Sequence, residues 1–326
     1  MNIKASIIII TYNQEDTIGK AIESVLAQRY AWPCQVVVGD DASTDGTRAV
    51  CEEYAARYPD KVLLMPAAPN KGIVGNYFDC LEACQGQYVA DCAGDDFWCD
   101  RDRLQIQTDY LDSHPQDVAV ISDWEIETGG RVTNTRDNED YARFRRHMQG
   151  KDMMMAALDS QSIFPLLSAM LYRREPVRQM LCADPRQIRR DEWRCEDLPL
   201  VTALGSLGNI GYVPVTASRY SVNGGGVSNT SDSGRLYDFY SRACGCVLDL
   251  CEIYGIGQKE ISTALDCRLK YLGNLALEAG DDGRAQDFRT LCRRVEPLGV
   301  KPRIYSMMLR SPAGRKFLRT IKSIDL

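Results

Sequence analysis

The chain has 326 residues, of which 44% are hydrophobic and 26% are charged, and its formal net charge at pH 7 is -6. This length is enough for one large domain, or a domain with a helical extension, to bury its own core. The composition is that of an ordinary globular protein, and the acidic balance argues against a general nucleic-acid binder. The charge is uneven: residues 301–326 carry seven basic side chains and one acidic one, so residues 1–300 carry a net of -12.

The cysteines and the apolar runs indicate the compartment. Thirteen cysteines are scattered without a Cys-x-x-Cys pair, which fits neither a zinc finger nor a disulfide scaffold. We therefore expect reduced thiols. The apolar run Ala5–Ile10 is too short for the core of a signal peptide, and no window approaches the length of a membrane span. These features predict a cytoplasmic protein.

The first hundred residues alternate β-branched apolar runs with helical patterns. The expected strands are 5–11, 35–39, 62–65 and 88–90. The expected helices are 18–26, one that begins after Ser43 or Thr44 and runs to about Tyr58, and 75–84, with a fourth opening at 100–103. Asp16 is expected to cap the first helix, and Ser43 or Thr44 the second. Strands and helices alternating at this spacing predict βαβ units and a mainly parallel sheet.

Polar clusters follow three of these strands. They are Tyr12-Asn13-Gln14, Asp40-Asp41 with Asp45 nearby, and Gly94-Asp95-Asp96. Because the carboxyl ends of parallel strands meet at one edge of a sheet, we expect all three to face one crevice. Adjacent carboxylates repel each other, and a divalent cation shared with a diphosphate relieves that repulsion. The alternative is that each acidic turn only caps a helix.

The first turn lacks the glycine fingerprints of other nucleotide-binding folds. After Thr11 there is no Gly-x-Gly and no Gly-Lys-Ser. We therefore expect phosphate to be held through a metal ion and carboxylates. The same absence argues against a sugar nucleotidyltransferase, which needs a glycine-rich basic loop there to grip a triphosphate.

With these motifs the chain resembles the family 2 glycosyltransferases of the GT-A fold, in the branch that works in bacterial polysaccharide biosynthesis. The resemblance covers roughly two thirds of the chain. It is carried by Ser6–Asn13, Asp40–Thr47, Asn70–Gly72 and Gly94–Trp98, followed by Asp100, Arg103, Leu104, Gln107, Leu111 and Pro115. It implies an α/β, Rossmann-like, mainly parallel sheet flanked by helices, with a helical C-terminal extension.

The resemblance also implies domains. Residues 1–230 form the GT-A domain, with a nucleotide-sugar half at 1–125 and an acceptor half at 126–230. Residues 231–326 form a helical region with a basic amphipathic tail. We expect a strand at 118–126 at the junction of the two halves and, in the acceptor half, a turn at Gly129-Gly130, an acceptor-side loop or solvated helix at 133–150 and a strand at 166–173. The helices expected in the C-terminal region are 237–254, 260–279 and 285–295.

On the donor side, the resemblance implies a role for each matching residue. Those expected at the nucleotide-sugar are Thr11, Tyr12, Asn13, Asp40, Asp41 and Asp95. Tyr12 and Asp41 are expected at the base, and Asp95 at the ribose or the metal shell. Asp96 is expected to ligate Mn²⁺ or Mg²⁺, hard cations that prefer carboxylate and phosphate oxygens. Asp45 could either cap a helix or contact the ligand. Lys71 could either be an ordinary solvent-exposed lysine or contact a phosphate.

A second acidic pair, Glu196-Asp197, opens a helix with an apolar inner face. Two acids at a helix N-terminus are favourable in themselves. In the resembled family this pair supplies the general base, and Asp197 is the matching position, with Glu196 beside it. Ser221 and Asn223 stand where relatives carry an Arg and a His, so a charged clamp is missing. Gly224–Gly226 is expected to form either a mobile loop over the donor or a surface turn.

These features predict a metal-dependent inverting glycosyltransferase. The expected donor is a nucleotide-sugar, most simply a UDP-sugar, and the expected acceptor is a hydroxyl of a saccharide or lipid-linked saccharide in capsule, O-antigen or exopolysaccharide synthesis. The basic tail either contacts an anionic membrane at the inner face of the cell membrane or packs on the preceding helices. The remaining alternative is a catalytically silent scaffold: the intact acidic positions argue against it, and Ser221 argues for it.

Overall fold

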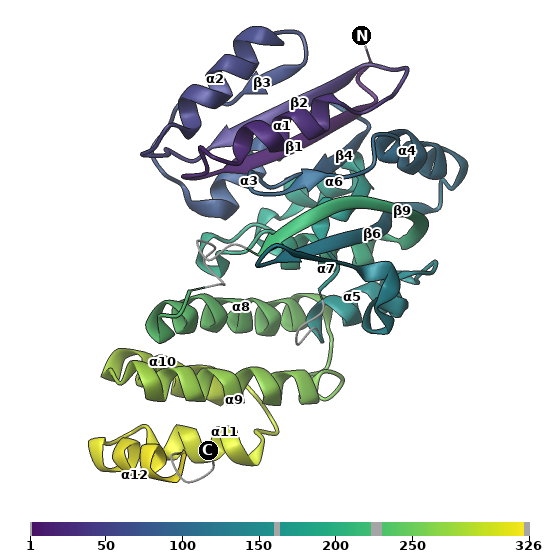
Figure 1. Ribbon diagram of the computed structural model, residues 1–326. Helices are drawn as coiled ribbons and strands as arrows, with labels where there is room; N and C mark the ends of the chain where they lie inside the picture. The colour runs from purple at the N-terminus through teal and green to yellow at the C-terminus, as the bar shows by residue number, and fades with distance from the viewer. Residues whose placement is uncertain (1, 160–163, 223–229, 323–326) are drawn as a thin grey trace. The chain divides into compact units, whose positions relative to one another are not determined.

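The computed structural model describes residues 2–159, 164–222 and 230–322, and the chain divides into two compact units. The first comprises residues 1–157, 163–191 and 195–222, and contains the sheet (Figure 1). The second comprises residues 158–162, 192–194 and 223–326, and is helical. Glycines 224–226, expected to form a loop or turn, and Asn223 lie outside the described residues.

The first unit is built on a sheet that contains nine strands among the described residues, in the order β3-β2-β1-β4-β8-β6-β9-β5, with β7 paired to β6. The strands are β1 (Ala5–Thr11), β2 (Cys34–Asp40), β3 (Val62–Leu64), β4 (Tyr88–Asp91), β5 (Phe97–Trp98), β6 (Asp117–Thr128), β7 (Arg131–Asn134), β8 (Met170–Arg173) and β9 (Asn209–Val222). The first four strands pair in parallel, as do β6 and β9, and the other pairs are antiparallel. The predicted α/β fold with a largely parallel sheet is confirmed.

Helices cover the sheet and close its core. They are α1 (Ile18–Leu26), α2 (Thr47–Arg57), α3 (Gly72–Ala83), α4 (Arg103–Ser113), α5 (Gly150–Leu158), α6 (Arg174–Ala183) and α7 (Asp197–Leu207). The 3₁₀ helices are η1 (Thr135–Asp137), η2 (Glu139–Phe144), η3 (Leu167–Ala169), η4 (Pro185–Gln187) and η5 (Asp191–Trp193). The central strand β1 is almost wholly buried, which explains its unbroken apolar sequence.

Two predicted helix caps are wrong. No side chain caps α1, because the carbonyl of Gln14 accepts the N–H groups of Thr17 and Ile18 in place of Asp16. Neither Ser43 nor Thr44 caps α2: the hydroxyl of Ser43 donates to Asp40 Oδ1 at 2.5 Å, and the first N–H of α2, that of Thr47, donates to Asp45 Oδ1 at 3.0 Å.

Two other predicted segments differ from the structure. The predicted strand at 166–173 is a strand only from residue 170, because carbonyls of η3 accept hydrogen bonds from side chains of α4 instead of a neighbouring strand. The segment at 133–150 is neither a plain loop nor a long helix, since it contains the end of β7, η1 and η2. The predicted turn is confirmed, because Gly129 and Gly130 have φ of 57° and 81° and join β6 to β7.

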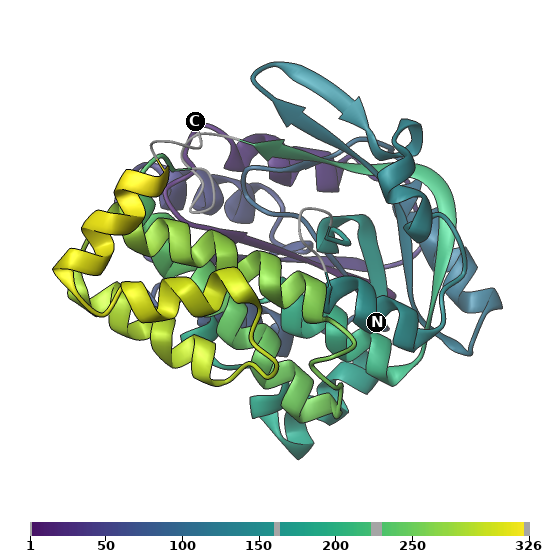
Figure 2. The same cartoon turned by 90° about the horizontal axis from the view of Figure 1, so that it is seen from below.

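The second unit contains five α-helices among the described residues, α8 (Ser233–Tyr254), α9 (Ser262–Ala279), α10 (Asp282–Arg293), α11 (Val300–Met308) and α12 (Pro312–Lys322). Within this unit they stack in layers, with α11 and α12 on the far side of α9 and α10 from α8 (Figures 1 and 2). Gly255 and Gly280 end α8 and α9 in the left-handed conformation. The three predicted helices are confirmed to within a few residues. No described helix combines the length and the apolarity needed to span a membrane.

All thirteen cysteines lie in the described part of the chain, and none of them forms a disulfide. This agrees with the prediction of reduced thiols. Burial raises the pKa of most of these thiols, for example that of Cys80 to about 12, so they are protonated at neutral pH and act as small apolar side chains.

Candidate active site

The three polar turns interlock at one edge of the sheet. Asp41 N–H donates to the carbonyl of Thr11 at 3.0 Å, and Thr44 N–H donates to Asn13 Oδ1 at 2.7 Å. Asn13 N–H in turn donates to the Ser43 hydroxyl at 2.9 Å. The turns after β1 and β2 are therefore joined by hydrogen bonds at one edge of the sheet, as predicted.

The third turn meets the first at Gly94. Its N–H donates to the carbonyl of Ile10 at 3.0 Å. A Cβ at this position would lie 2.4 Å from Gln14 Oε1 and 2.7 Å from Thr11 Oγ1, so only glycine fits there. This close approach brings the Asp95-Asp96 turn against the turn after β1.

Some side chains predicted to contact the nucleotide are exposed, while others are already bonded within the protein. Tyr12 is strongly exposed and can offer the face of its ring to a base. Asp41 is buried, and its Oδ1 accepts Lys71 N–H at 2.7 Å. The Asp40 carboxylate is bound to Ser43, and the Lys71 ammonium lies 2.5 Å from Asp79 Oδ2. Lys71 is therefore ion-paired, which does not favour the phosphate contact considered for it.

Asp96 is held by backbone and side chain within the first unit. It is only 4% exposed; its Oδ1 accepts Ser221 N–H at 3.1 Å, and its Oδ2 accepts the Ser168 hydroxyl at 3.4 Å. Burial and the neighbouring Asp95 raise the pKa of Asp96 to about 8, although these two hydrogen bonds oppose the shift. Burial also raises the pKa of Asp95. Placing both negative charges here is therefore costly without a cation.

Ser221, which stands where the resembled family carries an arginine, contacts Asp96 through its backbone N–H and not through its side chain. The neighbouring arginine on β9, Arg219, is engaged elsewhere: its guanidinium lies 2.7 Å from Glu125 Oε2 and 5.0 Å from the centre of the Phe97 ring. Arg219 therefore does not replace the missing clamp.

A buried arginine, Arg103, supports the position of Ser168 beside Asp96. The sequence identified it as part of the family motif but did not predict this structural role. Arg103 is fully buried and donates to the carbonyls of Ser168 at 2.6 Å and Met170 at 3.2 Å. Its guanidinium also lies 4.0 Å from the centre of the Trp98 ring and donates to Gln107 Oε1. Arg103 thus fixes η3, and with it the Ser168 hydroxyl that contacts Asp96.

The second acidic pair lies at the start of α7, as predicted. Glu196 and Asp197 are both partly buried, and Asp197 Oδ1 accepts Leu198 N–H at 2.7 Å. Burial raises the pKa of both carboxyls, and repulsion from Asp197 raises that of Glu196 further. A carboxyl whose pKa lies nearer to neutrality is a better proton acceptor from a hydroxyl group.

Asp91, at the end of β4, is a third acidic element that the sequence analysis missed. It is 6% exposed, and neither of its carboxylate oxygens has a hydrogen-bond partner among the described residues. Burial raises its pKa to about 7, although Tyr77 and Arg103 oppose the shift. Its charge also raises the pKa of Glu196. Asp91 thus lies on the strand that leads into the Asp95-Asp96 turn and acts electrostatically on Glu196. The sequence offered one signal for Asp91, since an acidic residue directly at the end of a buried apolar strand is unusual.

The acidic side chains at this edge fit a hard cation that is coordinated partly by carboxylate oxygens and partly by the phosphate oxygens of a substrate. Among the described residues no group of three or more His, Cys, Asp or Glu side chains forms a complete metal cage. One or two carboxylates combined with substrate phosphates is the usual way in which Mg²⁺ is held. The adjacent carboxylates of Asp95 and Asp96 suit this mode, and they supply only oxygen.

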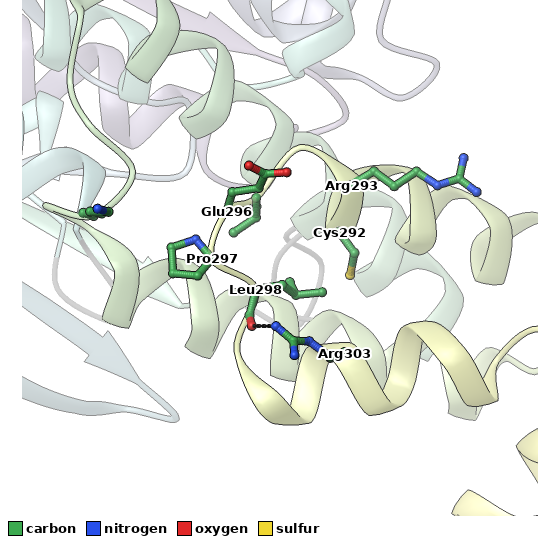
Figure 3. A pocket seen from close by; sticks show the side chains of 8 residues that line it. Cys292, Arg293, Glu296, Pro297, Leu298 and Arg303 are labelled. Atoms are coloured by element: carbon green, nitrogen blue, oxygen red, sulfur yellow. Dashed lines mark hydrogen bonds between the residues drawn. The ribbon is translucent and has the colours of Figure 1, made fainter.

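A separate hollow of about 690 Å³ lies in the second unit, between α10 and α11 (Figure 3). Arg303 Nη2 donates there to the carbonyl of Leu298 at 3.1 Å, and the Arg293 side chain points away from both. The hollow has one acidic side chain, Glu296, and contains none of the residues predicted for the site. It is therefore not the place for the chemistry of the acidic pairs.

Comparison with known proteins agrees with the geometry. The family model described as "Glycosyl transferase family 2" matches residues 6–181. An uncharacterised protein of Mycobacterium tuberculosis is 32% identical over 247 residues, 75% of this chain and 66% of that protein, so the chain spans slightly less than two thirds of that relative. TuaG of Bacillus subtilis, whose name assigns it to teichuronic acid biosynthesis, is 33% identical over 107 residues, 32% of this chain and 41% of TuaG.

Two solved structures share the fold. The structure of residues 1–349 of Staphylococcus aureus TarS in complex with UDP-GlcNAc has a TM-score of 0.60 at 15% identity, and covers 94% of this chain and 90% of that one. The mannosyltransferase PcManGT of Pyrobaculum calidifontis, in complex with GDP-Man and Mn²⁺, has a TM-score of 0.54 at 18% identity, and covers 96% of this chain and 86% of that one. At these identities the likeness concerns the fold alone.

Proposed function

This chain belongs to glycosyl transferase family 2, and on that premise we propose that it transfers a sugar, with inversion, from a nucleotide-sugar to a hydroxyl group. The observation that carries the proposal is the junction at the sheet edge. Three turns lock together there, and the last presents Asp96 between Ser221 and Ser168. We propose residues 1–230 as the catalytic domain, with the donor in the half formed by residues 1–125.

On the donor side, we assign base binding to Tyr12 and Asp41, with Thr11, Asn13 and Asp40 shaping the pocket. Tyr12 is exposed enough to stack on a base. Asp95 would meet the ribose or the metal shell. A UDP-sugar carrying a hexosyl or N-acetylhexosaminyl group is the first donor to test, because the TarS structure of the same fold holds UDP-GlcNAc.

Asp96 would hold Mn²⁺ or Mg²⁺, with Asp95 beside it. The ion would neutralise charge on the departing nucleoside diphosphate. The backbone N–H of Ser221 and the hydroxyl of Ser168 orient the Asp96 carboxylate before the donor binds. The mannosyltransferase of the same fold that holds Mn²⁺ with its nucleotide-sugar supports this choice of ion.

On the acceptor side, Asp197 would act as the general base, with Glu196 beside it. Its carboxylate takes the proton of the acceptor hydroxyl as the hydroxyl oxygen bonds to the anomeric carbon. The bond from that carbon to the diphosphate oxygen breaks with its electron pair on the leaving group. Attack occurs on the face opposite the leaving group, so the configuration inverts and no covalent enzyme intermediate forms.

We propose a saccharide or lipid-linked saccharide of a bacterial surface polysaccharide as the acceptor. The support is the similarity to TuaG, which is named for teichuronic acid biosynthesis. The silent scaffold is the second candidate, favoured by the serine at position 221 in place of the family's arginine. The preserved acids favour the enzyme, because a cation would relieve the repulsion between the carboxylates of Asp95 and the buried Asp96, and Asp197 stays available for proton transfer.

A screen of nucleotide-sugars tests the proposal. The purified chain is incubated with each donor and with Mn²⁺ or Mg²⁺, and hydrolysis and thermal stabilisation are measured. We expect one donor to be hydrolysed slowly and to raise the unfolding temperature in a metal-dependent way. The absence of metal-dependent stabilisation and of hydrolysis with every donor would favour the scaffold.

A further inference from the structure

The helices α11 and α12 carry large apolar side chains that no described residue covers. Nine large apolar side chains among the described residues are strongly exposed, and four of them fall between residues 300 and 317. Val300, Ile304, Met307 and Phe317 are 75%, 42%, 52% and 55% exposed. In a monomeric protein such clustering marks an interaction surface rather than chance.

The exposure of these side chains does not result from poor packing, because α11 has a second apolar face that is packed. Pro302 and Leu309 are buried, and the ring of Tyr305 lies against Gly273 of α9, where a Cβ would come within 2.8 Å of the ring. These residues are spaced i, i+3 and i+7. Val300, Ile304 and Met307 are spaced i, i+4 and i+7, which places them on the opposite side of the helix.

Basic side chains flank these apolar groups. Residues 297–322 contain seven basic residues and no acidic one. Some are used internally, since Arg315 Nη1 lies 2.6 Å from Asp282 Oδ1 and Arg319 Nη2 donates to the carbonyl of Leu277. Lys301, Arg310 and Lys316 are exposed, and their side chains make no hydrogen bond or ion pair within the described part of the chain. Their charge is therefore free to act outward.

Each helix of this layer contributes to the same kind of surface. Phe317 and Lys316 are adjacent and exposed on α12, while Leu318 packs inward. Views from the side and from below both show α11 and α12 as the outermost layer of the second unit (Figures 1 and 2). Apolar groups flanked by lysine and arginine match the boundary between the acyl chains and headgroups of an anionic bilayer.

We infer that the exposed sides of these two helices dock on an anionic lipid bilayer, through Val300, Lys301, Ile304, Met307 and Arg310 on and after α11 and through Lys316 and Phe317 on α12. The aromatic and aliphatic side chains enter the headgroup region, and the basic side chains contact acidic headgroups. The proposal goes beyond sugar transfer and does not depend on it. It also answers the question left by the sequence: one face of the tail packs on the preceding helices, and the other remains available for the membrane.

Sedimentation of the full chain with vesicles tests the inference. We expect binding to vesicles of phosphatidylcholine mixed with phosphatidylglycerol, little binding to phosphatidylcholine alone, and a decrease with added salt. Because each basic residue near an anionic surface contributes about fivefold, the variant K301E/R310E/K316E should lose about a hundredfold in partition coefficient. Replacing three apolar residues, as in I304S/M307S/F317S, should lose at least about tenfold.

The control removes exposed apolar side chains elsewhere. Leu63→Ser and Val132→Ser change residues of similar exposure in the first unit, and the double variant should bind vesicles as wild type does. Circular dichroism checks folding, and the single variant Phe317→Ser, a change at an exposed site, serves if a triple variant is unfolded. Transfer to a water-soluble acceptor should be the same in all of them.

Three results would overturn the inference. The first is equal sedimentation with neutral and anionic vesicles, and the second is undiminished binding by both triple variants. The third is a concentration-dependent dimer, seen by light scattering, that the same substitutions abolish while no vesicle binding occurs. That result would assign the surface to a second copy of the chain.

Discussion

The two acidic pairs of this protein look alike in sequence but lie in different settings. Asp95-Asp96 lies on a turn between two strands, where a backbone N–H and a serine hydroxyl hold the second carboxylate. Glu196-Asp197 opens a helix, and one carboxylate oxygen is taken by the next residue's N–H. Burial raises the pKa of acids in both pairs, so proton affinity does not distinguish them. We propose that the element carrying each pair, a hydrogen-bonded turn or the start of a helix, decides whether it holds a cation or accepts a proton.

The largest expected effect comes from Asp197→Asn. Removal of a general base lowers turnover by about a thousandfold, while the affinity for UDP and Mn²⁺ stays the same. Initial rates of sugar transfer and a binding titration measure the two separately. Glu196→Gln is the matched control and should cost less. Near-normal turnover in the Asp197 variant would show that the base lies elsewhere and that the two pairs do not divide the work.

Asp96→Asn should have the next largest effect. Turnover falls by about a hundredfold, and activity no longer responds to added Mn²⁺, because the amide is a poorer ligand than the carboxylate. The measurement is the rate as a function of metal concentration. Asp102→Asn, at an exposed carboxylate paired with Arg29, should retain the wild-type response. Undiminished metal-dependent turnover would remove Asp96 from the metal site.

Asp91→Asn tests the electrostatic link between Asp91 and Glu196, the neighbour of the proposed base. Because the Asp91 charge raises the pKa of Glu196, its removal should lower that pKa. Carboxyl titration followed by NMR in the variant and in wild type measures the shift, and an unchanged pKa of Glu196 would contradict the link.

The same variant has a predicted stability profile. The pKa of Asp91 in the folded protein is about 7, above its usual value of about 4 in the unfolded chain. Wild type is therefore most stable at low pH, where Asp91 is protonated in both states, and it loses stability as the pH rises from about 4 to about 7. Asparagine carries no charge. The stability of the variant relative to wild type should therefore rise between about pH 4 and about pH 8, by on the order of 2 kcal/mol. Denaturant unfolding at both pH values measures this, and a constant difference would contradict it.

Ser168→Ala should have the smallest effect. The hydroxyl lies 3.4 Å from Asp96 Oδ2, a long hydrogen bond, and Ser221 N–H still holds the other oxygen. Metal affinity should fall by about fivefold, with turnover at saturating metal retained. A loss as large as that of Asp96→Asn would mean that the serine itself is a ligand.

Where short-range pattern decided the structure, the sequence was a good guide. The isoleucine run of β1, the strand–turn order up to Asp96, and the glycine-terminated helices α8 and α9 were all predicted. The nucleotide-sugar and metal residues were named from the family resemblance. The structure shows that the turns carrying them share one edge of the sheet, while their roles remain proposals.

What the sequence did not show depends on contacts between distant residues. Ser168 and the Ser221 N–H reach Asp96 from 72 and 125 residues away. The hydrogen bonds from Arg103 to the carbonyls of Ser168 and Met170 also depend on the pairing of β8 with β4. Ser43 and Asn13 likewise bind each other from 30 residues apart. Local rules cannot anticipate such partners.

The most direct test of the central claim is a calorimetric titration of UDP into wild type and Asp96→Asn, each with and without Mn²⁺. We predict that Mn²⁺ strengthens UDP binding to wild type by at least about tenfold and leaves binding to the variant unchanged. Wild-type binding that is indifferent to Mn²⁺, or the same strengthening in both proteins, would contradict the account.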